Sequence, residues 1–315
     1  MYQMEISVII PVYNAETYIR AAVDSALQFD EVREVILVED CSPDNALVIC
    51  KELEVENERV KLFQHENGVN KGAGASRNLG IQKASCTYVA FLDADDLYVA
   101  NRFNAERDMV AQGKNFDAMY GALGIHFYST DAQEKYAGHF SSNFTVVRDF
   151  EAGESMFEEL LGMNSKRRGH IHLDTLTIRK EILDKMPLHF QENLRLHQDY
   201  EFTIRLGYYA SVIPGIIDQA IATRGVHLEN RYTQVGFKEK KYYRNQLLVW
   251  ESLNKWGEEE RIASKYKRLI SRRIYSYKIA SAYFLNAWGL FVKYLMKDQR
   301  LLKEYRIYYR TMLNR

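Results

Sequence analysis

The stretch that decides the fold is Ile6-Ser7-Val8-Ile9-Ile10-Pro11-Val12, which is followed directly by the polar pair Tyr13-Asn14. A short run that is almost entirely apolar is expected of a strand buried on both faces of a parallel sheet. Three further runs of this kind follow along the chain, at Val35 to Val38, Val60 to Phe63 and Tyr88 to Leu92. We predict that these four runs are strands of one sheet.

Helical patterns fill the gaps between the four predicted strands. Asn14 can cap the first helix, and Ser42 as N-cap with Pro43 as first helical residue can start a second helix that ends near Leu53. A third helix is predicted over Ala73 to Lys83. This alternation predicts an α/β fold with a mostly parallel, Rossmann-like sheet and helices on both faces. In such folds the ligand lies at the carboxyl ends of the strands.

Composition excludes several classes of protein. The 315 residues are 47% hydrophobic and 27% charged with only 4 Pro, which excludes a disordered, collagen-like or low-complexity chain. Cys41, Cys50 and Cys86 form no C-x-x-C pair, which argues against a disulfide framework or a zinc site and fits a reducing cytoplasm. Met1 to Glu5 lead straight into the first strand, so we expect no signal peptide. Polar residues interrupt Ile279 to Met296, which is not predicted to span a membrane.

Charge divides the chain although the total is balanced. The 42 Lys and Arg equal the 42 Asp and Glu, but Lys238 to Arg315 contain 19 basic and only 7 acidic residues. The preceding residues are therefore net acidic, and a split of this kind indicates two regions with different partners. We expect one domain over residues 1–235, divided into the halves 1–112 and 113–235. A basic, aromatic-rich helical region is expected over residues 236–315.

Three carboxylates follow the fourth predicted strand in the sequence Asp93-Ala94-Asp95-Asp96. Crowded carboxylates are costly without a counter-cation, and oxygen ligands beside a phosphate-bearing substrate suit Mg²⁺ or Mn²⁺. An isolated D-x-D is more often a solvated acidic turn that caps the next helix. The position at the carboxyl end of a buried strand favours the metal site here.

Glu39-Asp40 occupies the equivalent position after the second predicted strand. A carboxylate there can accept hydrogen bonds from a nucleobase imide or a ribose hydroxyl. The alternative is that Asp40 and Ser42 only shape the turn and cap the following helix, and both roles can hold together.

A glycine-rich stretch, Asn67 to Asn78, runs into the third predicted helix and contains Lys71 and Arg77. Its backbone N–H groups and the helix N-terminus can face a diphosphate, with Lys71 or Arg77 offsetting the negative charge. It contains neither a G-x-x-x-x-G-K-[ST] loop nor a G-x-G-x-x-G fingerprint after a strand. On glycine content alone, this signal is weak.

Four successive motifs resemble those of the family 2 glycosyltransferases: Ser7 to Asn14, Val38 to Ser42, Ala75 to Gly80 and Phe91 to Asp96. The match covers residues 6–96, with the motifs in the family's order. It implies a GT-A fold, a nucleotide-sugar donor, a divalent metal ion and inversion at the anomeric carbon.

The same resemblance implies roles for individual residues. Asp95 is the implied metal ligand, Asp40 meets the base, and Asp93 meets the ribose or the metal. The residues implied to bind the nucleotide sugar are Pro11, Tyr13, Asn14, Asp40 and Asp93, and Lys71, Arg77 and Ala94 are further candidates for this role. Residues 1–235 would then form the catalytic domain, with 1–112 as its nucleotide-sugar-binding half and 113–235 as its acceptor half.

The second half of the chain resembles the family more loosely. His197-Gln198-Asp199 resembles its Glu-Asp motif at the start of a helix, with Gln198 in place of the usual Glu. The Asp of that pair is the family's general base, which makes Asp199 the catalytic candidate. A like charge nearby raises the pKa of a base, and Gln cannot do this, so a weaker base or participation of Glu201 stays open. Alternatively, Asp199 is only an acidic residue favourable to the helix dipole.

Arg224 to His227 and Thr233 resemble the family's Arg-x-x-His and Ser/Thr segment, in which the His approaches the metal or the diphosphate. His227 is accordingly a second candidate metal ligand, although a lone His is more often structural. His170 and His172 would share one face of a strand, but no third ligand has diagnostic spacing. We assign these two to the acceptor pocket or to structure.

The region 238–315 combines its cations with 15 of the chain's 40 aromatic residues. Nucleic-acid binding is disfavoured because no recognised motif is present. One interpretation is a helical extension that packs on the catalytic domain and mediates a homodimer. The other is a peripheral membrane contact, in which Ile279 to Met296 lies at the interface and Lys297, Arg300 and Lys303 meet anionic lipid.

These observations predict an inverting glycosyltransferase of the hexosyl type, with a UDP-sugar as the favoured donor. The expected acceptor is a glycan or lipid-linked glycan of surface-polysaccharide synthesis, and the expected location is the cytoplasm or the inner face of the membrane. Asp199 would take the proton of the acceptor, and a metal on Asp95 would stabilise the leaving diphosphate. The alternative is a non-catalytic nucleotide-sugar-binding or assembly protein, which Gln198 keeps open. A nucleotidyltransferase is remote, because the expected glycine-rich signature near the N-terminus is missing.

Overall fold

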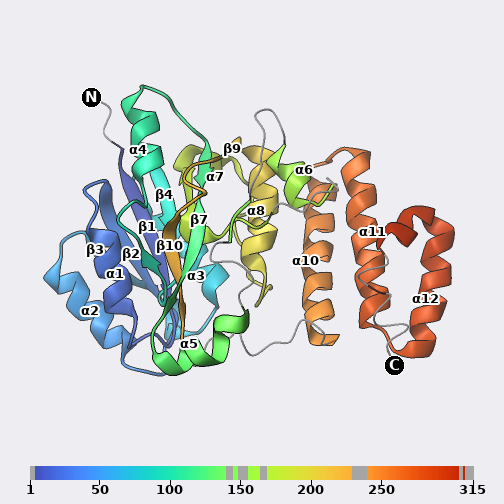
Figure 1. Cartoon of the computed structure of the whole chain (residues 1–315), viewed down its shortest axis with the longest axis horizontal. Helices are drawn as coiled ribbons and strands as arrows, with labels where there is room; N and C mark the ends of the chain where they lie inside the picture. The colour runs from blue at the N-terminus through green and yellow to red at the C-terminus, as the bar shows by residue number, and fades with distance from the viewer. Residues whose placement is uncertain are drawn as a thin grey trace. The chain divides into compact units, whose positions relative to one another are not determined.

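The computed structural model describes residues 4–139, 145–147, 155–163, 169–228, 240–304 and 308 (Figure 1). Its strands are β1 (Ile6–Val12), β2 (Val32–Glu39), β3 (Val60–Gln64), β4 (Tyr88–Phe91), β5 (Leu97–Tyr98), β6 (Ala118–Tyr120), β7 (Ala122–Phe127), β8 (Leu176–Arg179), β9 (Val212–Pro214) and β10 (Ala220–Val226). Its α-helices are α1 (Ile19–Leu27), α2 (Ala46–Glu56), α3 (Ala73–Lys83), α4 (Asn104–Ala111), α5 (Thr130–Tyr136), α6 (Met156–Leu160), α7 (Lys180–Lys185), α8 (Gln198–Tyr209), α10 (Lys240–Glu259), α11 (Ser264–Ser281) and α12 (Phe284–Lys297). Short 3₁₀ helices are η1 (Glu66–Gly68), η2 (Ala137–His139), η3 (Leu173–Thr175) and η4 (Gln299–Glu304).

The central sheet confirms the predicted α/β class. Within the described residues it has seven strands in the order β3-β2-β1-β4-β8-β6-β9. The pairs among β3, β2, β1 and β4 are parallel, whereas β8 runs antiparallel to both of its neighbours, β4 and β6. The sheet is therefore mostly parallel, and the inserted strand β8 brings a distant part of the chain beside β4.

Helices cover both faces of the parallel part of the sheet. Alternate side chains of β1 point to opposite faces and therefore contact different helices. Val8, Ile10 and Val12 join one core cluster with the buried side chains of α1 and α2. Ile9 points the other way, against α3. A Cβ at Gly80 of α3 would lie 2.3 Å from Ile9 Cγ2, so glycine allows this helix to pack closely on the sheet.

Two predicted helix starts are wrong. The N-cap of α1 is Tyr18 rather than Asn14, and the N-cap of α2 is Asn45 rather than Ser42. Ser42 instead joins two loops, because its N–H donates to Glu39 Oε1 (2.5 Å) and its Oγ accepts the N–H of Asn14 (3.2 Å). These hydrogen bonds tie together the loops that follow β1 and β2.

A buried carboxylate stabilises the amino-terminal end of the sheet. Glu34 on β2 is only 2% exposed. Its Oε1 accepts from Ser7 Oγ (2.6 Å) and from the N–H and hydroxyl of Ser85, and its Oε2 accepts from Lys61 Nζ (2.8 Å). Burial opposes ionisation, but these donors outweigh it and lower the pKa of Glu34 to about 2.

Replacing Glu34 with glutamine should therefore destabilise the fold by about 2 to 3 kcal/mol at neutral pH. The folded-state pKa lies below the ordinary value of 4.5, so the stabilisation is complete above pH 4.5 and is lost as the pH falls towards 2. Denaturant titrations of both proteins at several pH values should show their difference shrinking with acid. As the matched control, Glu56→Gln removes an exposed ion pair with Arg20 and should change stability much less. If the difference in unfolding free energy between the two proteins stays the same at low pH, the stabilising role of the ionised Glu34 is contradicted.

The first unit also contains a second sheet, which has three strands in the order β5-β10-β7. β10 pairs antiparallel with β5 and parallel with β7. Because β5 begins directly after Asp96, this pairing brings β10 beside the acidic loop that follows β4.

The chain divides into two compact units. The first comprises Met1–Arg195 and Phe202–Glu229 and contains both sheets, and the second comprises Leu196–Glu201 and Asn230–Arg315. In the second unit α11 packs against both α10 and α12. The predicted domain boundary at residue 236 lies outside the described residues and stays a prediction. Among the helices that the structure describes, none has the length and apolar character needed to cross a membrane.

Candidate active site

Asp40 is a buried carboxylate just beyond the end of β2, and it holds the glycine-rich loop in place. Its Oδ1 accepts the N–H of Lys71 (2.6 Å), its Oδ2 accepts the N–H of Gly72 (2.7 Å), and its carbonyl accepts from Asn70 Nδ2 (2.9 Å). The predicted base-binding residue thus fixes the backbone of Lys71 and Gly72 with both carboxylate oxygens. These contacts hold a loop that is distant in sequence rather than the turn and helix cap of the alternative. A contact of Asp40 with a nucleobase stays a prediction.

Arg77 on α3 joins the glycine-rich segment to the acidic loop. Its Nη2 donates to Asp93 Oδ1 at 2.5 Å, and its guanidinium lies over the ring of Phe190, 5.5 Å from the centroid. Arg77 is only 5% exposed, whereas the Asp93 side chain keeps a third of its surface accessible. A buried cation beside a partly exposed carboxylate is suited to orient that carboxylate towards a polar ligand.

Asp95 and His227, the two predicted metal ligands, lie together although 132 residues separate them in the sequence. His227 Nε2 is 3.2 Å from Asp95 Oδ2, and both side chains are partly accessible. The ring of Tyr18 stacks on His227 with centroids 4.5 Å apart, and the Tyr128 hydroxyl donates to the Asp95 carbonyl (3.1 Å). Aromatic side chains therefore fix the orientation of both candidate ligands.

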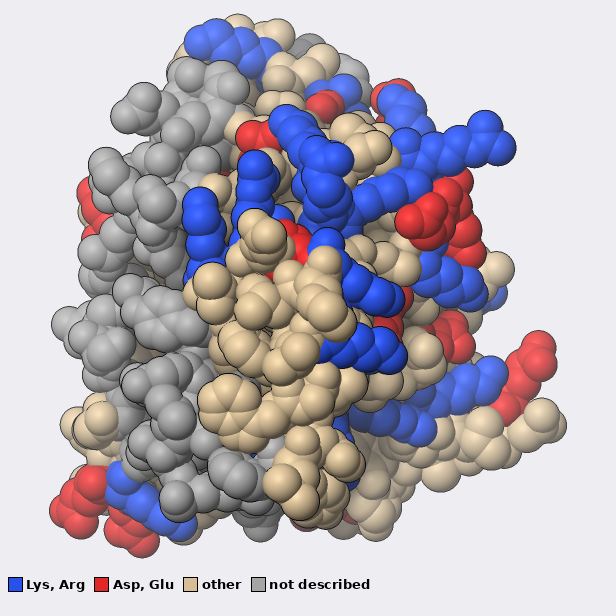
Figure 2. All heavy atoms as spheres, turned by 90° about the vertical axis from the view of Figure 1, so that its right-hand side faces the viewer, with Lys and Arg blue, Asp and Glu red and all other residues tan. Residues whose placement is uncertain are grey.

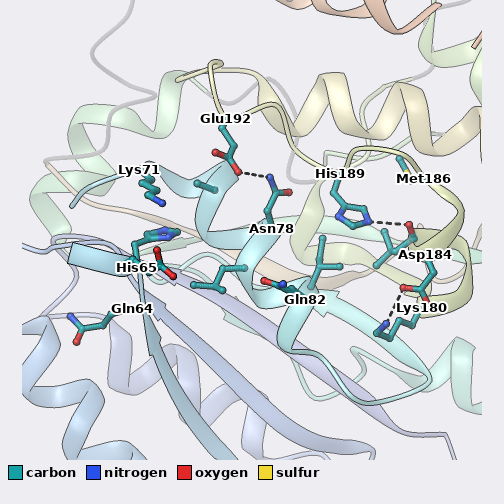
Figure 3. Close-up of a pocket in the computed structure, with 15 residues that line it drawn as sticks. Gln64, His65, Lys71, Asn78, Gln82, Lys180, Asp184, Met186, His189 and Glu192 are labelled. Atoms are coloured by element: carbon teal, nitrogen blue, oxygen red, sulfur yellow. Dashed lines mark hydrogen bonds and ion pairs between the residues drawn. The ribbon is translucent and has the colours of Figure 1, made fainter. Parts of the chain in front are cut away.

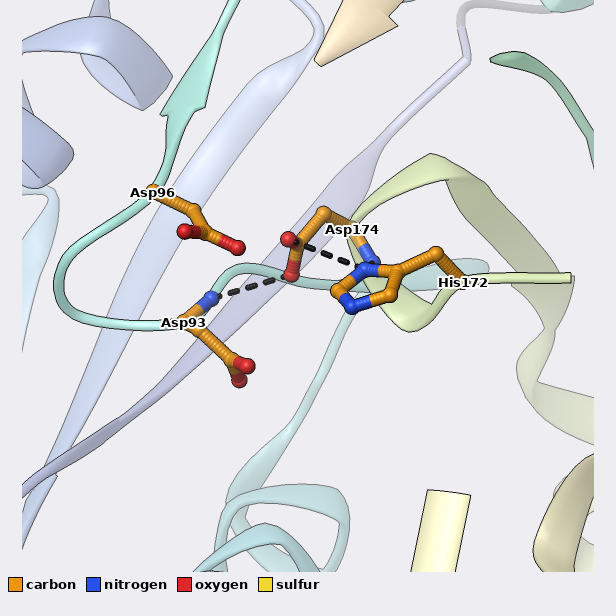
Figure 4. Close-up of side chains that lie close together, drawn as sticks. All are labelled: Asp93, Asp96, His172 and Asp174. Carbon is orange, nitrogen blue, oxygen red and sulfur yellow. Dashed lines mark hydrogen bonds and ion pairs between the residues drawn. The ribbon is translucent and has the colours of Figure 1, made fainter. Parts of the chain in front are cut away.

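A second group of donors lies on the other side of the same loop, where Asp93 and Asp96 face His172 and Asp174 (Figure 4). One ligand atom from each of the four residues lies within 4.8 Å of the others, a spacing compatible with a metal ion. Asp174 Oδ1 accepts the N–H of Asp93 (3.0 Å), and His172 Nδ1 is 3.1 Å from Asp174 Oδ2. Asp96 Oδ1 accepts the N–H of Gly225 (2.7 Å).

The buried pair Asp96 and Asp174 divides its protons unequally. Burial raises the pKa of Asp96, and the neighbouring Asp174 raises it further. Burial also opposes ionisation of Asp174, but the His172 imidazole, the Asp96 carboxyl and the Asp93 N–H together lower the pKa of Asp174. Asp174 is therefore the ionised member, and Asp96 keeps its proton more readily.

Asp174 is the important residue that sequence reasoning missed. Its support is Arg102, a fully buried arginine whose Nε donates to the Asp174 carbonyl (2.9 Å) and whose Nη2 donates to the Leu176 carbonyl (3.1 Å). The guanidinium also lies 4.4 Å from the centroid of the Phe103 ring. The sequence around Asp174 carries no motif, and His172 two residues before it was assigned only to the acceptor pocket or to structure. Their contact with Asp93 arises because β8 inserts beside β4.

The residues after β1 lie at the surface. Tyr13 is 39% exposed, Pro11 is partly buried, and Asn14 is exposed with a left-handed backbone φ of 55°. Asparagine tolerates this conformation better than most residues. Ala94 is buried between Asp93 and Asp95. The predicted nucleoside contact of these residues stays a prediction.

Lys71 lies at a cavity of about 750 Å³ that Figure 3 shows in close-up. The cavity is lined from α3 by Ala75, Asn78, Leu79 and Gln82, and it extends to His189 and Lys180. Ile81 of α3 also lines it, whereas Arg77 does not. Asp93, Asp95 and His227 do not line this cavity, so it is separate from the acidic loop.

Asp199 lies in the first turn of α8, in the segment Leu196–Glu201 that belongs to the second unit. Its side chain is partly accessible. Glu201 is fully buried, and its Oε1 accepts from Ser252 Oγ of α10 (2.9 Å). Glu201 is thus a packing residue, and the alternative that it participates as a base loses its support. Gln198 is buried, and its Oε1 makes no hydrogen bond to a described residue. Thr233 lies outside the described residues.

The donor atoms of Asp95 and His227 fit a divalent cation. Neighbouring ligands of an octahedral ion with bonds of about 2.1 Å lie roughly 3 Å apart, and the observed separation is 3.2 Å. The buried group around Asp174 is compatible with an ion by spacing, but backbone N–H groups and Arg77 already satisfy much of its negative charge. The acidic loop therefore offers a divalent cation two sets of donors, of which the Asp95–His227 set is the more accessible.

Comparison with known proteins bears on the same residues. The sequence profile of "Glycosyl transferase family 2" matches residues 7–147. This span contains Asp40, Arg77, Asp93 and Asp95. Residues 7–147 therefore resemble glycosyl transferase family 2, and the rest of the chain lies outside the match.

Individual proteins of known name are similar to part of the chain. The sequence is 37% identical over 121 residues to the UDP-Glc:alpha-D-GlcNAc-diphosphoundecaprenol beta-1,3-glucosyltransferase WfgD of Escherichia coli, a match of 38% of this chain and 46% of WfgD. It is 28% identical over 203 residues to the minor teichoic acid biosynthesis protein GgaA of Bacillus subtilis (strain 168), a match of 62% of this chain and 42% of GgaA. The chain thus spans less than half the length of these relatives.

One solved structure is similar to this chain over more residues than the family profile matches. The structure resembles that of residues 1–349 of S. aureus TarS with a TM-score of 0.55 and 20% identity, covering 88% of this chain and 71% of the TarS chain. At this identity the likeness shows the fold, which is the GT-A-type fold expected for family 2.

Proposed function

We propose that this protein is a family 2 glycosyltransferase that transfers a sugar from a nucleotide-diphosphate sugar to a hydroxyl of a glycan or lipid-linked glycan, with inversion at the anomeric carbon. The observation that carries the proposal is the convergence of Asp40, the Arg77–Asp93 pair and the Asp95–His227 pair at the carboxyl edge of β1, β2 and β4. In α/β folds this edge is the ligand site.

Known relatives support a UDP-sugar donor. TarS, which has a similar fold, was crystallised with UDP and with UDP-GlcNAc. WfgD is named for a UDP-Glc donor and a diphosphoundecaprenol-linked acceptor, and GgaA for teichoic acid biosynthesis. We therefore infer a UDP-sugar donor and an acceptor in surface-polysaccharide synthesis, with the enzyme working in the cytoplasm at the inner face of the membrane. We infer that residues 1–235 form the catalytic domain.

The nucleotide would be held by residues from three loops. Tyr13, which is partly exposed, would meet the base, next to Asn14 in the same loop and Pro11 near the end of β1. Asp40 would act mainly through the backbone of Lys71 and Gly72, whose position it fixes with both carboxylate oxygens. Asp93, oriented by Arg77, would accept a ribose hydroxyl.

Asp95 and His227 would hold the divalent cation, which supplies charge stabilisation for the leaving diphosphate. We favour Mn²⁺ over Mg²⁺, because Mg²⁺ is bound through oxygen ligands and an imidazole nitrogen is one of the two donors here. The Tyr18 ring stacked on His227 would keep the imidazole turned towards Asp95. Asp199 would remove the proton from the acceptor hydroxyl as it attacks, a general-base contribution of about 10² to 10⁴ in rate.

Nucleotide sugars should raise the melting temperature of the protein in a metal-dependent way. Thermal-shift measurements with UDP-glucose, UDP-N-acetylglucosamine, GDP-mannose and dTDP-glucose, each with and without Mn²⁺, would test this expectation. Binding stabilises by about 2.7 kcal/mol at a hundredfold excess over Kd. For a domain of this size that corresponds to a rise of several degrees.

Two controls make the result specific. Asp95→Asn should lose the metal-dependent part of the shift, whereas Asp108→Asn, an exposed carboxylate on α4, should keep it. If no nucleotide sugar shifts the melting temperature with or without metal, the proposed function is wrong. Tight binding without transfer or donor hydrolysis across a broad acceptor panel would instead favour a non-catalytic nucleotide-sugar binder.

A further inference from the structure

Helix α12 presents an apolar face that is exposed in the part of the chain that the structure describes. Leu285 and Met296 are 82% and 79% exposed, and Trp288 and Val292 are 41% and 53% exposed. Their spacing of three, four and four residues places all four on one side of the helix. The opposite side packs into the helical unit, where Ala287 is buried with Ile279 and Ala280 of α11. Four large apolar side chains on one exposed face are more than the scattered apolar residues of an ordinary surface.

Cations border this face. Lys293 and Lys297 lie on α12 to one side of the apolar face, and Arg300 and Lys303 follow in η4. All four side chains are exposed. None of them makes an ion pair with a residue that the structure describes. Figure 2 shows Lys and Arg side chains above and to the right of an uncharged area.

The acidic residues of the same segment do not offset these cations at the surface. Asp298 pairs with Arg272 (2.8 Å), and Glu304 pairs with Arg273, so both carboxylates are turned towards α11. These internal pairs fix the end of α12 and η4 to the helical unit. The outward charge of residues 283–304 is therefore positive only.

We propose that the α12 face, defined as Leu285, Trp288, Val292 and Met296 with the four bordering cations, docks on an anionic lipid surface. The helix has 14 residues, a length of about 21 Å, and the hydrocarbon core of a bilayer is about 30 Å thick. It therefore lies in the plane of the interface, with apolar side chains among the acyl chains and cations at lipid phosphates. Trp288 is the residue type that occupies the headgroup level.

Charge decides between a lipid surface and a second copy of the chain. A two-fold interface would place the same face on both copies and gather the cations of both around one rim, with no exposed acid of this segment to pair with them. An anionic membrane supplies the missing negative charge. This proposal rests on the helical unit alone and does not depend on the proposed transferase activity.

The test is co-sedimentation of the full chain with vesicles of phosphatidylcholine alone and of phosphatidylcholine mixed with phosphatidylglycerol. We expect binding to the anionic vesicles, weakened by salt because the cations contribute. The variant Leu285→Ser/Trp288→Ser/Met296→Ser should lower the partition coefficient roughly tenfold or more. The variant Lys293→Gln/Lys297→Gln should lower it by a similar factor without touching the packed side of the helix.

Matched controls come from the first unit. Val55→Ser replaces an apolar side chain on α2 that is 87% exposed, and Lys51→Gln/Lys114→Gln removes two exposed lysines. Both should bind vesicles like the unaltered protein. If the full chain does not bind anionic vesicles, or if the α12 variants bind as well as the controls, the proposal is overturned. A dimer in sedimentation velocity that the apolar variant dissolves, without vesicle binding, would overturn it in favour of a subunit interface.

Discussion

Replacing Asp199 with asparagine should lower the turnover number by about 10² to 10⁴ while leaving the affinity for the nucleotide sugar unchanged. The substitution keeps the size of the side chain and removes only its ability to accept a proton from the acceptor hydroxyl. A fall in kcat with unchanged donor binding is the result expected when a group acts only in the chemical step. The measurement is steady-state transfer from the UDP-sugar that gives the largest thermal shift, together with a donor titration of the variant.

Glu201→Gln is the informative control for this experiment because it removes a carboxylate two residues away on the same helix. Glu201 is buried and accepts from Ser252, so its loss should lower the melting temperature with little change in kcat for the folded protein. The opposite pattern, with turnover retained in Asp199→Asn and lost in Glu201→Gln, would move the base to Glu201. Turnover retained in both variants would place it elsewhere.

The parallel part of the fold is readable from sequence because each strand is a short apolar run and each strand is followed by a helix. Ile6–Val12 and Ala73–Lys83 were predicted with the bounds that the structure has. Helix starts were predicted less well, since Asn14 and Ser42 are good capping residues that bond to each other's loops instead. A local preference for capping does not show whether a tertiary partner competes for the same side chain.

The residues of the candidate site also differ in how well the sequence predicts them. Asp40, Asp93 and Asp95 follow strands directly, so the fold itself brings them to one edge. Asp174 has no such signal, because its place beside Asp93 follows from the antiparallel insertion of β8 between β4 and β6. The sequence gives still less indication of the role of Arg102. A fully buried arginine is rare, and its role is recognisable only once the carbonyl groups that accept its hydrogen bonds are known.

The site also depends on Gly225, which lies inside the Arg-x-x-His segment but is not one of its defining residues. Gly225 on β10 donates its N–H to Asp96 Oδ1, and a Cβ at this position would lie 1.8 Å from the Asp95 carbonyl oxygen and 2.5 Å from Tyr128 Cε2. Because the nearest atom belongs to the backbone, the acidic loop cannot yield by rotating a side chain. Only glycine lets β10 approach the loop closely enough to bring His227 to Asp95.

Gly225→Ala should therefore displace Asp95 from His227 and weaken Mn²⁺-dependent nucleotide-sugar binding by roughly tenfold or more, the consequence of about 1 to 3 kcal/mol of overpacking. Calorimetric titration of Mn²⁺ and donor would measure the loss, with circular dichroism to confirm the fold. Gly138→Ala is the matched control, because a Cβ there meets nothing within 4 Å. Tyr128→Phe is a milder variant that removes the hydrogen bond to the same Asp95 carbonyl without adding bulk, and it should weaken binding by a smaller factor. Unchanged affinity in Gly225→Ala would show that the approach of β10 does not position the metal ligands.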